Sequence, residues 1–126
     1  DSYLSKEERV AAANASGADL LVSVHCNYSE TDSDLSGVHV SYADGDKESR
    51  SLAENIDAAL VKETGAKDQG SNSCDFSIVN DTDMPAVLVE AGYLSNESEG
   101  RELADDVYEN SIAKGIAKGV LATLNR

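Results

Sequence analysis

Apolar and polar positions change their spacing several times along the chain, and this spacing predicts strands and helices in turn. Short apolar runs at residues 20–24 and 86–90 are rich in β-branched side chains and predict two buried strands. Residues 37–43 alternate apolar with polar side chains, which is the period of another strand. Residues 76–79 form a short apolar segment that we also interpret as a strand.

The helices are marked by their ends as well as by their apolar spacing. Ser5 followed by Glu8 forms a capping box, which predicts a helix over residues 6–16. Helical spacing of apolar residues over 48–64 predicts a second helix, and Gly65 is suited to end it.

The last part of the chain predicts two more helices and completes the fold class. A second capping box at Asn96 and Glu99 precedes apolar residues at helical spacing up to residue 124, with a break near 108–110. The polar segments 28–36 and 66–73 predict loops. Strands that alternate with helices predict an α/β domain, with a mostly parallel twisted sheet covered by helices in three α/β/α layers.

Length and charge limit the classes of function. A chain of 126 residues suits one domain. Its net charge of −14 argues against a nucleic-acid partner, because phosphate contacts need clustered Lys and Arg. No apolar run approaches the roughly 20 residues that span a bilayer, so we expect no membrane insertion.

The two cysteines, Cys26 and Cys74, do not form a C-x-x-C pair, which disfavours a Cys-rich zinc site. They could form one disulfide, and their spacing does not decide this. We favour two ordinary, partly buried thiols.

Two polar residues stand where apolar strands end. His25 follows residues 20–24, and Glu90 closes residues 86–90. Ligand sites of open α/β sheets form at the carboxyl ends of parallel strands, so neighbouring strands would bring this imidazole and carboxylate together. Such a pair suits metal-assisted hydrolysis, with His as a zinc ligand and a carboxylate that takes a proton from water. Each residue also has a structural interpretation: a hydrogen-bonded His, and a Glu that caps a helix or pairs with Lys. We interpret His39, in the middle of its strand, as a surface histidine of the sheet.

Several blocks of sequence together resemble one enzyme family. Residues 9–27 (RVAAANASGADLLVSVHCN) and 84–96 (MPAVLVEAGYLSN) are similar to the zinc-dependent N-acetylmuramoyl-L-alanine amidases, which are bacterial cell-wall hydrolases. Residues 36–38 (SGV) resemble a strand start of that family, and residues 112–116 resemble its last helix. The resemblance covers essentially the whole chain, in order.

The resemblance implies hydrolysis of the amide between N-acetylmuramic acid and the L-alanine of the stem peptide. It implies zinc as the cofactor, peptidoglycan as the partner, and a location outside the cytoplasmic membrane, at the cell wall or in the periplasm. His25 matches a zinc ligand of the family, and Glu90 matches the catalytic carboxylate that activates the zinc-bound water. Asn27 matches a motif asparagine that we expect to shape the following loop.

The chain also departs from the family, which binds zinc through two histidines and a glutamate. The family's other His and its Glu precede the point that aligns with Asp1. We therefore expect residues 1–126 to be an amidase-like catalytic domain that is incomplete at its N-terminus. The missing ligands would lie upstream in the gene product or in another chain. Alternatively, the chain is a non-catalytic envelope module that binds peptidoglycan or a partner. The absence of the family's first strand would expose a sheet edge and favour self-association.

Overall fold

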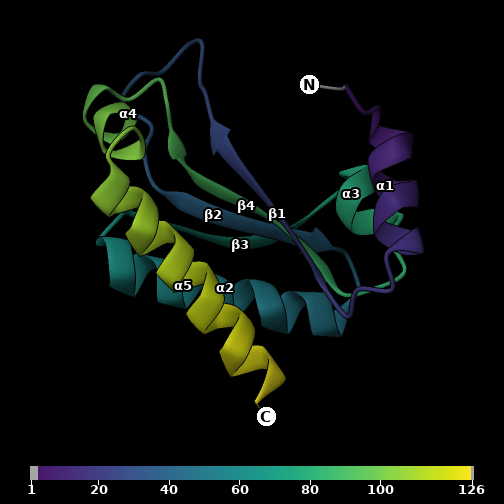
Figure 1. Cartoon of the computed structure of the whole chain (residues 1–126). Coiled ribbons are helices and arrows are strands. Elements are labelled where there is room, and N and C mark those ends of the chain that lie inside the picture. Colours follow the sequence, from purple (N-terminus) through teal and green to yellow (C-terminus); the bar gives the residue numbers. More distant parts are fainter. Residues whose placement is uncertain (1–2, 126) are drawn as a thin grey trace.

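The computed structural model describes residues 3–125 as one mixed sheet with helices packed against it (Figure 1). The elements follow in the order α1 (Lys6–Ala15), β1 (Leu21–Asn27), β2 (Val38–Ala43), α2 (Lys47–Thr64), β3 (Asp68–Cys74), α3 (Ser77–Asn80), β4 (Ala86–Tyr93), α4 (Glu97–Leu103) and α5 (Asp106–Leu124).

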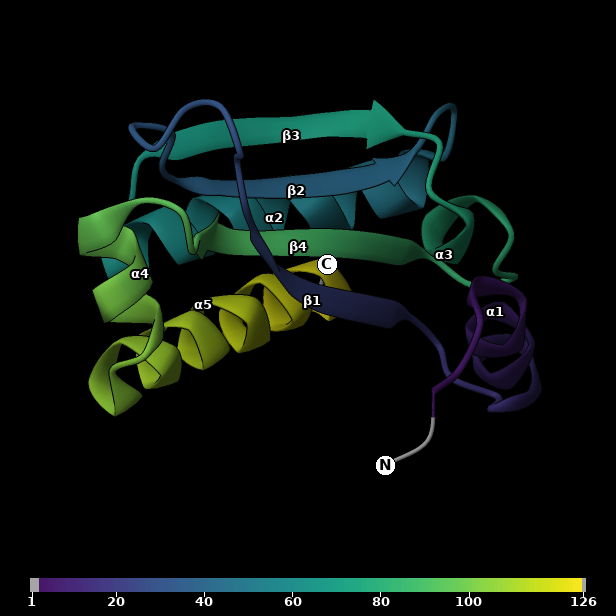
Figure 2. The same ribbon diagram turned by 90° about the horizontal axis from the view of Figure 1, so that it is seen from above.

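The sheet has the strand order β1-β4-β2-β3, so the last strand in sequence lies between the first two. β1 is parallel to β4 and β2 is parallel to β3, as predicted for a mostly parallel sheet. The central pair, β2 and β4, is antiparallel and makes the sheet mixed. Figure 2 shows the four strands side by side, with β1 and β3 at the two edges.

Helices lie on both faces of the sheet, which confirms the three predicted layers. α2 and α5 cover one face, and the main core between them and the sheet includes Val40, Ile56, Leu60 and Val89. α1 and α3 lie together on the other face at one end (Figures 1 and 2), where Val79 and Leu88 form a smaller apolar cluster. The rest of this second face carries no helix, so polar side chains of the strands there reach solvent.

α2 and α5 approach each other closely because two glycines of α5 face α2. A Cβ at Gly115 would lie 2.9 Å from the Cα of Leu60, and a Cβ at Gly119 would lie 2.7 Å from the backbone nitrogen of Ile56. Neither position therefore has room for a side chain, and the two helix backbones are in direct contact.

The helix ends confirm the first capping box and half of the second. Ser5 and Glu8 exchange both hydrogen bonds of the box at 3.1 Å. Asn96 caps α4 by accepting from the Glu99 N–H. The Glu99 carboxylate, however, turns into the protein and accepts from the backbone N–H groups of Gly37 and Tyr93 instead.

Three predicted elements were wrong. Most of the expected loop at 66–73 belongs to strand β3, which pairs with β2 but has mainly polar side chains, so its sequence carries no apolar strand pattern. The expected strand at 76–79 is the helical turn α3, whose Val79 packs into the smaller apolar cluster. The break between the last helices falls at Ala104 and Asp105 rather than at 108–110, because the Asp105 side chain caps α5 by accepting from the Val107 N–H.

One edge of the sheet is open in the described part of the chain. β1 pairs with β4 alone, and Val24 on β1 is 51% exposed. The two thiols, Cys26 and Cys74, are free, as we favoured, but only Cys74 is partly buried as expected, because Cys26 lies exposed on the edge strand β1. Within residues 3–125, no helix combines the length and the apolar character needed to cross a bilayer.

Candidate active site

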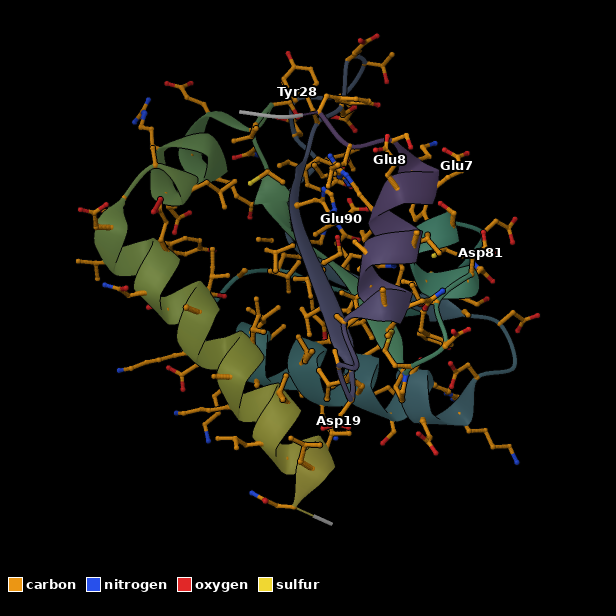
Figure 3. All side chains as sticks on the ribbon, turned by 45° about the vertical axis from the view of Figure 1, so that its right-hand side comes forward. Glu7, Glu8, Asp19, Tyr28, Asp81 and Glu90 are labelled. Carbon is orange, nitrogen blue, oxygen red and sulfur yellow. The ribbon has the colours of Figure 1, made fainter. Side chains whose placement is uncertain are left out.

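His25 and Glu90 lie side by side in the sheet, as the sequence predicted. They are register partners in the parallel pairing of β1 with β4. Glu90 alternates with Val89 and Ala91, which are buried in the main core, so its side chain points to the opposite face. Figure 3 shows Glu90 on the side of the sheet away from α2 and α5.

A third titratable residue, His39, completes a row across three strands. His39 is the register partner of Glu90 in the antiparallel pairing with β2. His39 lies near the start of β2. Because β2 is antiparallel to β4, the start of β2 lies beside the end of β4, and His39 is therefore next to Glu90. Our interpretation of His39 as an unremarkable surface histidine therefore missed its position next to Glu90. The sequence held one signal, a polar residue alternating with apolar ones, but nothing in it paired β2 with β4.

The two residues predicted to act in chemistry are accessible. His25 is exposed, and its Nε2 lies 2.7 Å from the Ser23 hydroxyl, while no described residue contacts Nδ1 by a hydrogen bond. Glu90 is half-buried, and within the described part of the chain its carboxylate makes neither a hydrogen bond nor an ion pair. An unpaired carboxylate can accept a proton from a bound water molecule and return it to a leaving group.

Clefts lie on both sides of this row. One, of about 370 Å³, lies between α1 and β1, with His25 in its wall and the charged residues Lys6, Glu7 and Arg9 opposite. The other, of about 480 Å³, lies over β2 and β3 and contains Glu90 and His39. Phe76 lines both clefts, so together they flank the row of titratable groups.

Short polar contacts hold the surroundings of the site in place. Asn14 on α1 donates to the Asp81 carbonyl and accepts from the Asp83 N–H, which fixes α1, and with it Arg9, against the turn before β4. Figure 3 shows α1, with Glu7 and Glu8, above this turn and Asp81 beside it.

The loop after β1 is fixed in the same way. The side-chain oxygen of Asn27 accepts from the Tyr28 N–H, and the backbone carbonyl of Asn27 accepts from the Leu94 N–H. The Ser95 hydroxyl accepts from the Ser29 N–H. The Ser-Asn pair at 95–96 therefore anchors the loop that Asn27 begins.

Comparison with known proteins decides the family. The N-acetylmuramoyl-L-alanine amidase family matches residues 1–122. The chain belongs to the N-acetylmuramoyl-L-alanine amidase family.

Solved amidases have the same fold. The N-acetylmuramoyl-L-alanine amidase of Clostridium difficile 630 is 32% identical, with a TM-score of 0.96 over 99% of this chain and 68% of that one. The catalytic domain of the amidase CwlV from Bacillus (Paenibacillus) polymyxa var. colistinus is 34% identical, with a TM-score of 0.91 over 99% of this chain and 68% of that one. Among curated proteins, the amidase LytC of Bacillus subtilis is 31% identical over 97% of this chain.

This amidase-family chain is shorter than its relatives. It spans 25% of LytC and 58% of another curated relative, YqiI of Bacillus subtilis. Tested against the zinc site that the resemblance implies, the described residues supply only a part. His25 offers an imidazole beside a carboxylate, but no three His, Cys, Asp or Glu side chains in the described part of this chain group together as a metal site.

Proposed function

We propose that this chain carries part of the active site of a peptidoglycan hydrolase that cleaves the amide between N-acetylmuramic acid and L-alanine. The observation that carries the proposal is the position of Glu90. Its carboxylate has no partner in the described structure, faces a cleft, and lies beside His25 in the pattern of a family of amidases.

Glu90 is the group that moves protons in this proposal. It takes a proton from the attacking water as the new C–O bond forms, and gives that proton to the amide nitrogen as the C–N bond breaks. The products are the lactyl carboxylate of N-acetylmuramic acid and the free amino group of the peptide.

Zinc is the proposed cofactor, and His25 its proposed ligand. Catalytic zinc sites normally use three protein ligands, so the remaining ligands would have to come from outside the described residues. Because peptidoglycan is the proposed substrate, we propose that the protein acts at the cell wall, outside the cytoplasmic membrane.

A second function has one observation in its favour. Since the described residues hold no three-ligand metal site, the chain could serve as a non-catalytic envelope module that binds peptidoglycan without cleaving it. Self-association through the open edge of β1 stays a prediction, which sedimentation velocity would test.

Cleavage of a defined muropeptide by the intact gene product tests the proposal. We expect Glu90→Gln to lower the rate of release of the stem peptide by about 10²–10⁴-fold, the usual contribution of a general acid–base group. Glu97→Gln makes the equivalent change at an exposed side chain of α4. It is the control and should leave the rate unchanged. Bound zinc is measured in parallel and should fall in His25→Ala but not in Glu90→Gln. A wild-type protein that binds the muropeptide without cleaving it would instead support the envelope module.

A further inference from the structure

The cleft over β2 and β3 is lined mainly by neutral hydrogen-bonding side chains. Besides Glu90 it holds Asn27, Gln69 and Asn72, with Ser41 and Ser73 between them, and its described lining includes no Lys, Arg or Asp. A surface of amides and hydroxyls suits a ligand that offers uncharged carbonyl and N–H groups, as a peptide backbone does.

The amide of Asn72 has a fixed orientation in this cleft. His39 Nε2 lies 3.0 Å from Asn72 Oδ1, which can only accept, so Nε2 carries the proton. The other ring nitrogen, Nδ1, then accepts from the Ser41 hydroxyl at 3.3 Å. Ser41 is buried, so this chain of bonds starts from a fixed point inside the sheet.

This series of hydrogen bonds leaves one donor group of Asn72 without a partner. With Oδ1 held by His39, the Asn72 Nδ2 amino group has no partner among the described residues. The other amides of the cleft differ. Gln69 Nε2 donates to the Ser36 carbonyl at 2.7 Å. Asn27 Nδ2 is likewise without a partner among the described residues, but Asn27 lies on β1, on the far side of β4 from β3.

We propose that Asn72, oriented by His39 and Ser41, donates a hydrogen bond to a backbone carbonyl of the peptide part of the substrate. This inference rests on the proposed function for the identity of that peptide. Asn72 is thus a binding residue and His39 a positioning residue.

The sheet geometry indicates which part of the peptide Asn72 reaches. β3 lies two strands from β4, which is about 10 Å at roughly 4.8 Å per strand, and Asn72 is in register with Ser41 and Leu88, two residues along β4 from Glu90. The two positions are therefore about 12 Å apart. An extended peptide covers that span in about three residues. Asn72 therefore recognises the second or third residue of the stem, and the reacting amide remains beside Glu90.

Binding of two substrates of different length tests this inference. The intact gene product is titrated with N-acetylmuramoyl-tripeptide and with N-acetylmuramoyl-L-alanine, and dissociation constants are measured by ¹⁵N NMR. The reference protein and every variant in this titration carry Glu90→Gln, so that the ligands are not hydrolysed, and release of product is assayed separately with Glu90 intact. Asn72→Asp keeps the acceptor for His39 but removes the donor. We expect it to weaken tripeptide binding about fivefold, the effect of one neutral hydrogen bond, and to leave the short ligand unaffected.

Three further variants separate a specific role of Asn72 from a general disturbance of the protein. Asn110→Asp makes the same chemical change at an exposed position of α5, which packs on the other face of the sheet. This variant should bind both ligands as the reference protein does. His39→Ala frees the Asn72 amide to rotate, so it should weaken tripeptide binding, but by less than Asn72→Asp does. His39→Gln can still donate a hydrogen bond to Asn72, so it should restore part of the tripeptide affinity that His39→Ala loses.

The outcomes distinguish this inference from the proposed function. Equal tripeptide binding by the reference protein and Asn72→Asp, or equal losses for both ligands, would overturn it, as would a reference protein that does not bind the tripeptide. Tripeptide binding through Asn72, together with no release of product when Glu90 is intact, would support the inference and refute the proposed hydrolysis.

Discussion

The direct contact between α2 and α5 predicts that one methyl group at Gly119 destabilises the protein. In Gly119→Ala the new Cβ would lie 2.7 Å from both N and Cγ1 of Ile56, whereas carbon atoms pack at about 3.5–4.0 Å. The Cα of Ile56 is crowded as well, and because N and Cα both belong to the backbone of α2, a change of rotamer cannot relieve the overlap. The helices must therefore separate by about 1 Å.

Two opposing terms set the size of the effect. Overpacking of a tight interface costs about 1–3 kcal/mol, and a backbone clash belongs at the upper end. Replacing Gly by Ala inside a helix contributes about 1 kcal/mol in the other direction. We therefore expect a net loss of about 2 kcal/mol in the free energy of unfolding.

Urea unfolding followed by circular dichroism measures this loss, and the midpoint should fall without a large change in its slope. Ala117→Gly, at an exposed position of the same helix, isolates the propensity term and should cost about 1 kcal/mol. If Gly119→Ala proved more stable than the wild type by about 1 kcal/mol, propensity alone would account for it and the close helix contact would be refuted.

Two further predictions concern buried carboxyl groups. Burial on α2, followed by the hydrogen bond and charge of Asp68, raises the pKa of Asp57 from 3.8 to about 7. A native pKa above the unfolded one stabilises the fold at low pH, and this stability is lost as the pH rises from about 4 to about 7. Asp57→Asn should therefore gain about 2 kcal/mol relative to the wild type between pH 5 and pH 8 in urea unfolding, and an equal pH dependence in both proteins would contradict the assignment. Glu99 is 5% exposed and accepts from two backbone N–H groups, so Glu99→Ala should cost about 3 kcal/mol in the same assay. Glu97→Ala, which removes only an exposed ion pair with Arg101, should cost less than about 0.5 kcal/mol, and similar losses for both variants would exclude a special role for Glu99.

The elements predicted correctly are those whose burial leaves a pattern in the sequence. β4 is apolar because most of its residues are buried in the middle of the sheet, and α2 buries one stripe of residues while exposing the others. β1 carries an apolar run although it is an edge strand with no fully buried residue, so the prediction of its position was correct but that of its burial was wrong. β3, by contrast, is held by its pairing with β2 and by polar contacts, so its sequence resembles a loop. Four residues at 76–79 are too few to distinguish a strand from one turn of helix.

The site was predictable only in part, for a related reason. His25 and Glu90 each follow an apolar run along the chain, so local sequence was sufficient to select them. His39 and Asn72 depend on which strands are neighbours, and pairing between distant segments leaves no local signal. The roles of His25 and Glu90 in chemistry were predicted from their places at the strand ends and supported by the family resemblance, and they stay predictions until the variants are assayed.

The position of β4 between β1 and β2 has a consequence for how the protein is made. About sixty residues separate His25 from Glu90, so the ribosome completes both β1 and β2 long before β4 exists. Contacts between such distant segments form late and slowly in folding. A nascent chain that ends before β4 therefore cannot hold the row of His25, Glu90 and His39, and the pairing of β4 with β1 and β2 assembles the site.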